Sequence, residues 1–381
     1  MPTRDESGAR DTKVSLTEVA ATLASRMFLV VMALAFLTAI VTSVGFGLAT
    51  IIREYSGCHK TLAQLEDKQS HATYQHLDIA LNESKRLNES LFVGLHNSYH
   101  QASPLSGVVQ SWAYSHPPFS RQLDLGYREF EIDVHWRRNS FDWRVFHVLM
   151  MDQGTSCTCL VTCLMEIRQW MHDPRHRNKH TPIIVHIEPR GYKYNDLFCE
   201  RADGERRIMQ LQQLVYDLFR DDIYFPANLT RGQPNALAAL HGTGWPTVAE
   251  LKGKILFNLN IFSSNMKCKD LYFNVNGVSS AGTLQLSRDL LGDDASVAGS
   301  DDEPKRKVFF NRGTREDAER STTTVMMEVT ASEVVLNRSL LSDGFITRLR
   351  IGRKPEDGKF ISTLHRLIPA MLISYDGVSP G

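Results

Sequence analysis

The chain has 381 residues, of which 42% are hydrophobic and 23% charged, and its 43 Lys and Arg residues balance its 43 Asp and Glu residues. This length allows one large domain of about 250–300 residues with appendages, or two ordinary domains. The neutral balance excludes a strongly basic nucleic-acid-binding protein and a chain with a long acidic tail.

A long uncharged segment lies near the N-terminus. No Asp, Glu, Lys or Arg occurs from Met27 to Ile52, and most of these side chains are apolar. A helix of this length would extend about 39 Å, enough to cross a hydrocarbon core about 30 Å thick. We therefore predict an uncleaved transmembrane signal anchor at 27–52, preceded by a polar cytoplasmic tail at 1–26. A cleaved signal peptide and a buried core helix are the alternatives.

The cysteines and the glycosylation sequons bear on which side of a membrane the rest of the chain would lie. All six cysteines follow the uncharged segment, and an even number is consistent with disulfides. Acceptor sequons need a luminal or extracellular face, and all four follow the same segment, at Asn82, Asn88, Asn228 and Asn337. We therefore predict a single-pass membrane protein whose catalytic part is luminal or extracellular.

After a polar stretch at 53–90, which we expect to be a stalk, short apolar runs alternate with helical patterns. The expected strands are Leu91–Leu95, Tyr127–Trp136, Trp143–Leu149, Pro182–Ile187, Lys254–Leu259, Thr324–Val329, Phe345–Leu349 and Ala370–Tyr375. The expected helices include Leu160–Met171 and Ile208–Phe219. This alternation indicates parallel β/α units. About eight strands in roughly 290 residues fit an α/β fold of the (β/α)8 TIM-barrel type over 91–381. A doubly wound open sheet is the alternative.

One segment within this region differs in composition. Residues 293–323 contain acidic and basic runs separated by small residues. Such a composition favours a flexible insertion in a surface loop.

Polar residues occur where several of the expected strands end. In chain order they are His96 and Asn97 after the first strand, Glu131 and Asp133 on one face of the second, His147 in the third and Glu188 at the end of the fourth. Side chains alternate along a strand, which is why Glu131 and Asp133 share a face. Catalytic residues of TIM barrels lie at the C-terminal ends of the strands, so we expect these residues to form one site.

The chemistry of this set points to a divalent cation and phosphodiester cleavage. Three carboxylates and one amide, from Asn97, Glu131, Asp133 and Glu188, are hard oxygen ligands that suit Ca²⁺ or Mg²⁺ better than zinc. A cation and a histidine can neutralise charge on phosphoryl oxygens while another group protonates the leaving oxygen.

At these positions the sequence resembles a known family, the phosphatidylinositol-specific phospholipases C, and within it the calcium-dependent, bacterial-type branch. The motifs that carry the resemblance are Gly94-Leu95-His96-Asn97-Ser98-Tyr99, Glu131-Ile132-Asp133, His147, Ile187-Glu188-Pro189 and Ile373-Ser374-Tyr375-Asp376. The likeness covers roughly residues 91–381. No single motif is specific to the family. Taken together, in this order and at the ends of the strands, the motifs are specific.

The resemblance implies a role for each matched residue. Ca²⁺, in preference to Mg²⁺, would bind Asn97, Glu131, Asp133 and Glu188. His96 would stabilise the phosphorane, and His147 would act as general acid toward the diacylglycerol oxygen and then as base for water. Arg190 replaces an expected Lys and, with Tyr375 and Asp376, is a candidate substrate-binding residue. The implied products are diacylglycerol and an inositol phosphate formed through a cyclic phosphodiester, and the implied partner is a phospholipid in a membrane. We expect no nucleic acid and no obligate protein partner.

Other interpretations of these residues remain open. His135 competes with His147 for the catalytic role, whereas His100 and His186 are expected to be structural. The Cys157-x-Cys159-x3-Cys163 cluster lacks four-ligand zinc spacing, so we expect a local disulfide, with Cys157 and Cys163 as the favoured pair. A glycerophosphodiester phosphodiesterase or a phospholipase-D-like barrel enzyme is the first alternative function, and a non-catalytic lipid-binding membrane protein is the second.

Overall fold

The structure is a computed structural model. It describes residues 23–39, 41–42, 82–103, 109, 112–136, 143–190, 204–260, 272–274, 277–278, 306–329, 343–351 and 371–375. The chain divides into two compact units, Met1–Gly57 and Cys58–Gly381. In the first unit, residues 23–39 and 41–42 are helical.

The predicted membrane span is not supported. Within the parts of the chain that the structure describes, no helix combines the length and the apolar character needed to cross a bilayer, which takes about 20 consecutive apolar residues. This finding contradicts both the transmembrane signal anchor predicted at 27–52 and the single-pass membrane location with a luminal or extracellular catalytic part.

The second unit is built on a sheet that curls until its first and last strands meet. Its parallel strands are β1 (Leu91–Leu95), β2 (Glu129–Trp136), β4 (Ile183–Arg190), β5 (Ile255–Leu259), β6 (Phe309–Arg312), β7 (Thr324–Val329), β8 (Ile346–Ile351) and β9 (Met371–Tyr375). Strand β1 pairs with β9 on one side and with β2 on the other, so these strands form a ring. A short strand, β3 (Trp143–Val145), runs antiparallel to β2 outside the ring. The fold is therefore TIM-barrel-like, and the alternative of an open sheet is wrong.

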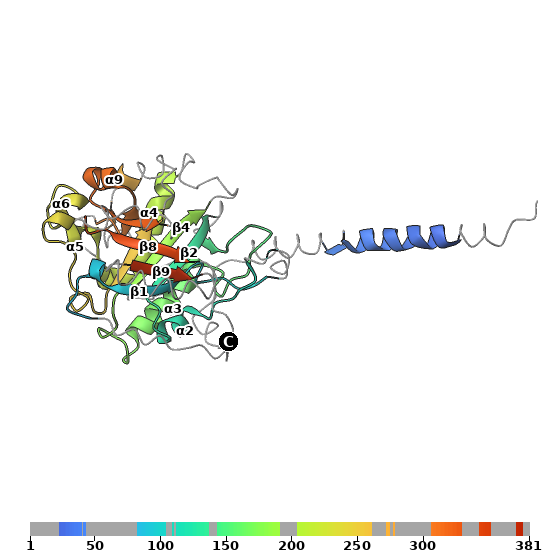
Figure 1. The fold of residues 1–381 in the computed structure, drawn as a ribbon, viewed down its shortest axis with the longest axis horizontal. Coiled ribbons are helices and arrows are strands. Elements are labelled where there is room, and N and C mark those ends of the chain that lie inside the picture. Colours follow the sequence, from blue (N-terminus) through green and yellow to red (C-terminus); the bar gives the residue numbers. More distant parts are fainter. Residues whose placement is uncertain are drawn as a thin grey trace, which may run out of the picture. The chain divides into compact units, whose positions relative to one another are not determined.

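Helices cover the outside of this ring (Figure 1). They are η2 (Leu87–Glu89), α2 (Phe119–Asp124), α3 (Leu160–His172), α4 (Gly204–Phe219), η6 (Arg220–Asp222), α5 (Pro226–Thr230), α6 (Ala236–His241) and α9 (Arg315–Arg320). In α3, Leu160, Leu164 and Ile167 recur at helical spacing and are fully buried. They pack in the same cluster as Phe130 and Ile132 of β2. Burial of each such side chain contributes about 1.5–3 kcal/mol, which fixes the helix against the sheet.

Strand β2 carries two different faces. Phe130, Ile132 and Val134 belong to the hydrophobic cluster beneath the helices. Glu129, Glu131 and Asp133 alternate with them and are also fully buried. Since side chains alternate along a strand, these carboxylates point into the ring. This placement concentrates negative charge inside the barrel.

The structure changes two of the expected boundaries. Part of the segment 293–323, predicted as a flexible insertion, forms β6 and α9. The run Val308-Phe309-Phe310 is buried there. The run is short and charged residues flank it, so its sequence does not indicate a strand. The end of the predicted stalk at 53–90 also belongs to the barrel unit, since Leu87 is buried and Arg86 bridges to Thr247.

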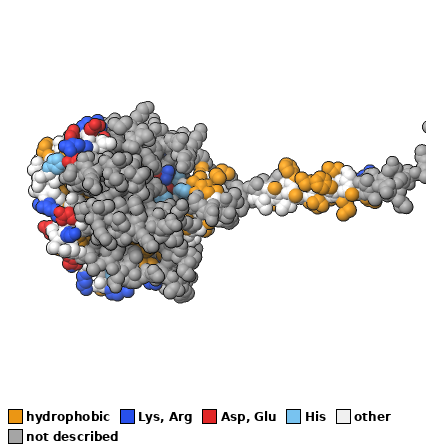
Figure 2. Space-filling model, viewed as in Figure 1, with side chains coloured by type: hydrophobic (Ala, Val, Ile, Leu, Met, Phe, Trp, Pro, Cys, Tyr) orange, Lys and Arg blue, Asp and Glu red, His pale blue; other side chains and the backbone are white. Residues whose placement is uncertain are grey.

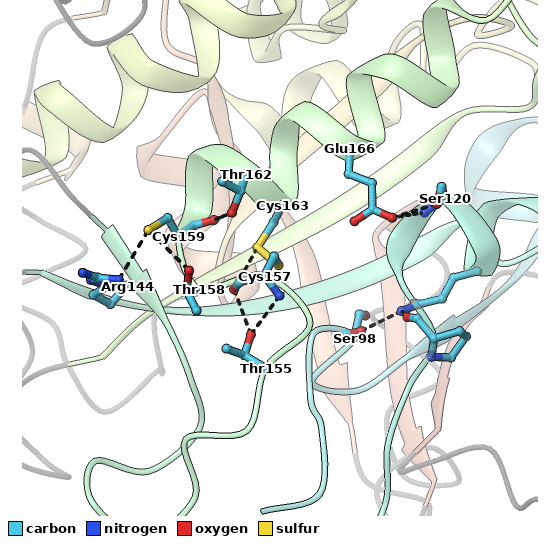
Figure 3. The surroundings of a disulfide bond; sticks show 12 residues. Ser98, Ser120, Arg144, Thr155, Cys157, Thr158, Cys159, Thr162, Cys163 and Glu166 are labelled. Carbon is cyan, nitrogen blue, oxygen red and sulfur yellow. Dashed lines mark hydrogen bonds between the residues drawn. A yellow bond between two sulfur atoms is a disulfide. The ribbon is translucent and has the colours of Figure 1, made fainter. Parts of the chain in front are cut away.

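A disulfide lies where the chain enters α3 (Figure 3). It joins Cys157 to Cys163, the pair favoured from the sequence. Thr155 donates a hydrogen bond of 2.8 Å from its hydroxyl to the carbonyl of Cys157. Cys159 is also disulfide-bonded, and none of the cysteines that the structure describes is free. The bridge ties the loop that precedes α3 to the first turns of the helix.

Candidate active site

Three of the predicted metal ligands lie together at the C-terminal ends of β2 and β4. In the parallel register of these strands Asp133 is opposite Glu188, and Glu131 lies two residues earlier on the same face. Each of the three offers a carboxylate oxygen within 4.8 Å of the others, and all three are fully buried. Like charges this close repel each other, so the cluster needs cations.

Two arginines supply part of the compensating charge. Nε of Arg190 lies 3.3 Å from Oδ2 of Asp133, and its Nη2 lies 2.6 Å from Oε1 of Glu188. Nε of Arg348 in β8 lies 2.7 Å from Oε1 of Glu129, and its Nη2 lies 2.5 Å from Oε2 of Glu131. Burial by itself would lower the pKa of Arg190, but the charges of Asp133 and Glu188 outweigh burial and raise it.

The remaining charge suits one divalent cation. Glu129, Glu131, Asp133 and Glu188 carry four negative charges when ionised, and the two arginines return two, which leaves a net charge of −2. Burial, followed by the charge of Asp133, raises the pKa of Glu188 well above its usual range, as expected of a crowded carboxylate without enough cation. The buried Oδ1 of Asp133 accepts no hydrogen bond from the described residues. The donor set and its charge therefore fit Ca²⁺.

His96 and Asn97 come directly after β1 and are held against β2. The backbone N–H of Ser98 donates to the carbonyl of Glu131 at 3.0 Å, and the hydroxyl of Ser98 accepts from the N–H of Glu131 at 3.0 Å. Asn97 adopts a left-handed backbone conformation, with φ of 48°, and its side chain is buried. Nε2 of His96 lies 3.7 Å from Oε2 of Glu131. The structure thus brings His96 to the carboxylate cluster.

His147 belongs to a second group, which it forms with Asp152 and His100. Nδ1 of His147 and Nε2 of His100 lie 2.9 Å and 2.8 Å from the same oxygen, Oδ2 of Asp152. Burial would raise the pKa of Asp152, but the hydrogen bonds from His100 and His147 outweigh burial and lower it. Asp152 therefore fixes the ring of His147 with Nδ1 as the donor, which leaves Nε2 for chemistry.

His100 has an acceptor at each ring nitrogen. Its Nδ1 lies 2.9 Å from the carbonyl oxygen of Tyr114, which can only accept, so Nδ1 must carry a hydrogen. Its Nε2 lies 2.8 Å from Oδ2 of Asp152. His100 thus links Asp152 to the backbone of Tyr114.

Tyr114 connects the two groups. The amide of Asn97 donates to the hydroxyl of Tyr114 at 3.1 Å. The rings of Tyr114 and His100 lie 4.2 Å apart between centroids. A short chain of contacts therefore leads from the predicted ligand Asn97 to the Asp152 group.

The competing histidines have structural partners. Nε2 of His135 lies 3.0 Å from the carbonyl of Phe146, and the two rings stack with centroids 3.7 Å apart. His186 lies deeper in the ring, 3.2 Å from Oε1 of Glu129, and burial holds its pKa well below the usual range. Both arrangements favour the expectation that His147, and neither of these two, meets the substrate.

The remaining predicted residues are distributed as follows. The backbone of Tyr375 pairs with Leu95 at the end of β1, and Asp376 lies outside the described residues. Among the sequons, Asn82 and Asn228 are exposed, Asn88 is half-buried, and Asn337 lies outside the described residues.

Three residues of this region had not been assigned a role from the sequence: Arg348, Asp152 and Asn260. Asn260 follows β5 and donates from Nδ2 to Oε2 of Glu188 at 3.0 Å. A charged residue inside an expected buried strand needs a buried partner, and that signal could have identified Arg348. No local pattern marks the other two, because their partners depend on how the loops fold.

A cavity of about 370 Å³ lies apart from this site. Its lining includes Arg86, His241, Trp245, Asp343 and Gly344, which lie at or near the N-terminal ends of the strands. The N-terminal face of such barrels contributes to stability and does not carry the chemistry, so the carboxylate cluster remains the candidate site.

Comparisons with known proteins agree with the family resemblance. The family model of phosphoinositide phospholipase C, Ca²⁺-dependent, matches residues 137–280. Among solved structures, the apo form of a calcium-dependent phosphoinositol-specific phospholipase C from a Gram-negative bacterium, Pseudomonas sp., aligns with a TM-score of 0.52 and 15% identity over 82% of this chain and 98% of that one. A myoinositol complex under the same description aligns with a TM-score of 0.50 and 18% identity over 78% and 94%.

At these identities the structural likeness shows the fold alone. A comparison with curated proteins found no match. The family match, over residues 137–280, agrees with the family predicted from the sequence, and with the enzyme class and the calcium dependence that this family implies.

Proposed function

We propose that this chain is a calcium-dependent phosphoinositide phospholipase C that cleaves the glycerol–phosphate bond of phosphatidylinositol-type lipids. The observation that carries the proposal is the buried cluster of Glu131, Asp133 and Glu188, with its excess of negative charge, beside His96. Asn97 completes the proposed set of oxygen ligands. When bound there, Ca²⁺ would lower the cost of charge on the phosphoryl oxygens.

His96 is the residue proposed to meet the phosphoryl group. Its Nε2 lies 3.7 Å from Oε2 of Glu131, beside the proposed metal ligands, where a donor could stabilise the charge that develops on the phosphoryl oxygens. Glu131 or Asp133, or alternatively His96 itself, would accept the proton of the inositol 2-hydroxyl as that oxygen attacks phosphorus. The attack would form the cyclic phosphodiester and break the bond to the glycerol oxygen.

His147 is the proposed general acid. Because Asp152 takes the hydrogen bond from Nδ1, the proton on Nε2 is the one available to the departing glycerol oxygen. The neutral ring that results can then accept a proton from water, which opens the cyclic phosphodiester to inositol phosphate.

Arg190 and Tyr375 are proposed substrate contacts. Arg190 is held by Asp133 and Glu188, and its planar group would bind phosphate oxygens beside them. For Tyr375 the proposal rests on the backbone pairing beside Leu95, at the same end of the ring. Asp376, next along the chain, is proposed with it on the sequence alone.

The decisive experiment incubates the full chain with phosphatidylinositol vesicles, with calcium or with a chelator, and resolves the products by phosphorus NMR. We expect calcium-dependent formation of inositol phosphate, cyclic or open. Glu131→Gln should lower turnover by at least about 10²-fold. Glu166→Gln is the matched control, because Glu166 is a half-buried carboxylate on α3 that accepts from Ser120, away from the cluster.

Two results would contradict the proposal. Retained turnover in Glu131→Gln would remove the metal cluster from the mechanism. Hydrolysis of glycerophosphoinositol without cleavage of phosphatidylinositol would assign the chain to the glycerophosphodiester phosphodiesterases.

A further inference from the structure

A second cluster of metal-ligating side chains surrounds Asp152. Oδ2 of Asp152 lies 2.9 Å from Nδ1 of His147 and 2.8 Å from Nε2 of His100. Each of the three residues offers a ligand atom within 4.8 Å of the others. Among the described residues, only this group and the carboxylate cluster of the candidate active site bring three such side chains so close together. The carboxylate cluster offers oxygen atoms alone, whereas this group offers two ring nitrogens and one oxygen.

These ligand atoms suit zinc better than calcium. Ca²⁺ binds about six to eight oxygen atoms, whereas Zn²⁺ binds histidine nitrogens and carboxylate oxygens in a tetrahedral arrangement. Two histidines and one carboxylate leave the fourth position open for water. Zinc bonds of about 2.0–2.2 Å place the ligand atoms about 3.3 Å apart, so Oδ2 of Asp152 needs to move only about half an ångström away from the two nitrogens to admit the ion.

Two further features of the group are typical of metal ligands. Nδ1 of His100 lies 2.9 Å from the carbonyl oxygen of Tyr114, and metal-binding histidines usually donate from their second ring nitrogen in this way. The other carboxylate oxygen of Asp152, Oδ1, is buried and accepts no hydrogen bond from the described residues. A buried carboxylate oxygen without a donor is costly, and a cation bound to the carboxylate offsets this cost.

The group can be reached from the side of His147. The side chain of His147 is 19% exposed, whereas those of His100 and Asp152 are fully buried. Figure 2 shows histidine side chains among those at the surface of this unit. His147 is therefore the ligand that an incoming ion meets first.

We propose that His100, His147 and Asp152 form a zinc site, and that zinc bound there inhibits the proposed general acid. The inhibitory role rests on the proposed function, whereas the binding of zinc does not. Zn²⁺ takes the place of the hydrogen on Nδ1 of His147, which is released to water, and also binds Nε2 of His100 and Oδ2 of Asp152. The bound ring of His147 is then a neutral ligand that holds its hydrogen on Nε2, so the departing glycerol oxygen receives no proton.

The first test measures zinc binding without catalysis. The full chain is titrated with Zn²⁺ in a calorimeter, in saturating calcium so that the carboxylate cluster is occupied. His100→Gln and His147→Gln each remove a ligand and should weaken binding at least about a hundredfold, because loss of an outer-shell partner alone costs about 10–100-fold. His241→Gln is the matched control, since His241 lies 2.9 Å from the carboxylate of Asp343 but no third described ligand completes a cluster there.

The structure of the bound site can be checked in the wild type. X-ray absorption of the zinc-loaded chain should show two imidazole ligands at the ion, and a shell of oxygens or sulfurs alone would overturn the proposal. Unchanged zinc affinity in both variants, with each shown to be folded by thermal unfolding, would also overturn it. If His100→Gln does not fold, the half-buried His147 variant and the absorption spectrum still decide.

The second test measures inhibition with two leaving groups. In saturating calcium, zinc should lower turnover of phosphatidylinositol at least about 10²-fold. A phenol ester of inositol phosphate, whose leaving group departs without protonation, should be inhibited much less. Equal inhibition of both substrates would mean that zinc replaces calcium or acts elsewhere, and would overturn the inhibitory role. If the wild type cleaves neither substrate, the proposed function fails, and calorimetry and X-ray absorption alone then decide whether the zinc site exists.

Discussion

One carboxylate oxygen of Asp152 contacts two histidines, His100 and His147. Through these contacts Asp152 orients the ring of His147. His147 needs Nδ1 fixed as a donor so that Nε2 points outward with the mobile proton. His100, which also lies 2.9 Å from the carbonyl of Tyr114, contacts the same oxygen of Asp152 and holds it in place. Asp152 is therefore a positioning residue for the proposed general acid, and His100 positions Asp152.

The variant Asp152→Asn tests this positioning role by comparing two substrates, one whose leaving group needs a proton and one whose leaving group does not. An amide can turn its NH₂ toward His147, so the ring would no longer be fixed with its proton on Nε2. We expect turnover of phosphatidylinositol to fall about 10²-fold. A phenol ester of inositol phosphate, whose leaving group departs without protonation, should lose much less. The measurement is kcat on both substrates.

Asp124→Asn is the matched control, because Asp124 accepts from Trp170 on the outside of the barrel. It should leave both turnover numbers near those of the wild type. An equal loss on the two substrates in Asp152→Asn would instead indicate general damage to the loop and would contradict the positioning role.

At the residue scale, the sequence predicted the side chains whose positions follow from strand geometry alone. Glu131, Asp133 and Glu188 were found because alternation within a strand and the common edge of parallel strands place them together. Arg348 was not, because it meets Glu129 across 219 residues of chain. The bond between His147 and Asp152 depends on a turn whose shape no local propensity specifies.

At the scale of elements, the pairing of β1 with β2 depends on a residue without a side chain. Gly94 lies opposite Glu129 in the register. A Cβ at this position would collide with the carboxylate and the backbone carbonyl of Glu129. Glu129 cannot move away freely, because Arg348 and His186 hold it. The glycine therefore makes room for the charges beneath the candidate metal site.

Gly94→Ala should destabilise the protein by about 3 kcal/mol, as expected for overpacking in a rigid core. Thermal unfolding followed by circular dichroism measures the change. Gly232→Ala is the control, since a Cβ there meets no atom within 4 Å but φ is +83°, so only backbone strain of about 1 kcal/mol is expected. Equal losses in the two variants would show that the collision at Gly94 is relieved at no cost.

Whether a strand could be predicted from the sequence depended on its length and on the residues that flank it. Strand β7 has the bounds expected from the sequence, and β4 extends three residues further because Glu188 and Arg190 are paired inside the barrel. Strand β6 was missed because a short apolar run between charges looks like a loop. The predicted single-pass location was wrong, since no helix among the described residues is long and apolar enough to cross a bilayer; the length of an apolar run alone does not specify such a helix.

At the scale of the whole molecule, the excess negative charge inside the ring links calcium to stability. A ligand that binds only the folded protein raises its stability by about 2.7 kcal/mol at a concentration one hundred times Kd. We therefore expect Tm to rise by several degrees with calcium and to fall back with a chelator. This prediction does not depend on catalysis.

Glu188→Gln should abolish most of the calcium shift in Tm, because it removes one of three clustered carboxylates. The control Glu166→Gln should keep the shift, since Glu166 bonds Ser120 outside the cluster. Differential scanning calorimetry of the three proteins, with calcium and with chelator, makes the comparison. A full shift in Glu188→Gln would place the calcium site elsewhere.

Strand β9 closes the ring between β8 and β1. Because β9 is the last of these strands to be synthesised, it also affects how the chain folds during translation. Both neighbours of β9 keep an unsatisfied hydrogen-bonding edge until it is synthesised. At about 5–20 residues per second, roughly 15–60 s pass between the translation of β1 and that of β9. During this interval the free edge of β1 is exposed to other chains on the same polysome, and the edge of β8 joins it only near the end, when β8 has been synthesised. Ribosome-associated chaperones are therefore expected to determine how much of this protein a cell obtains.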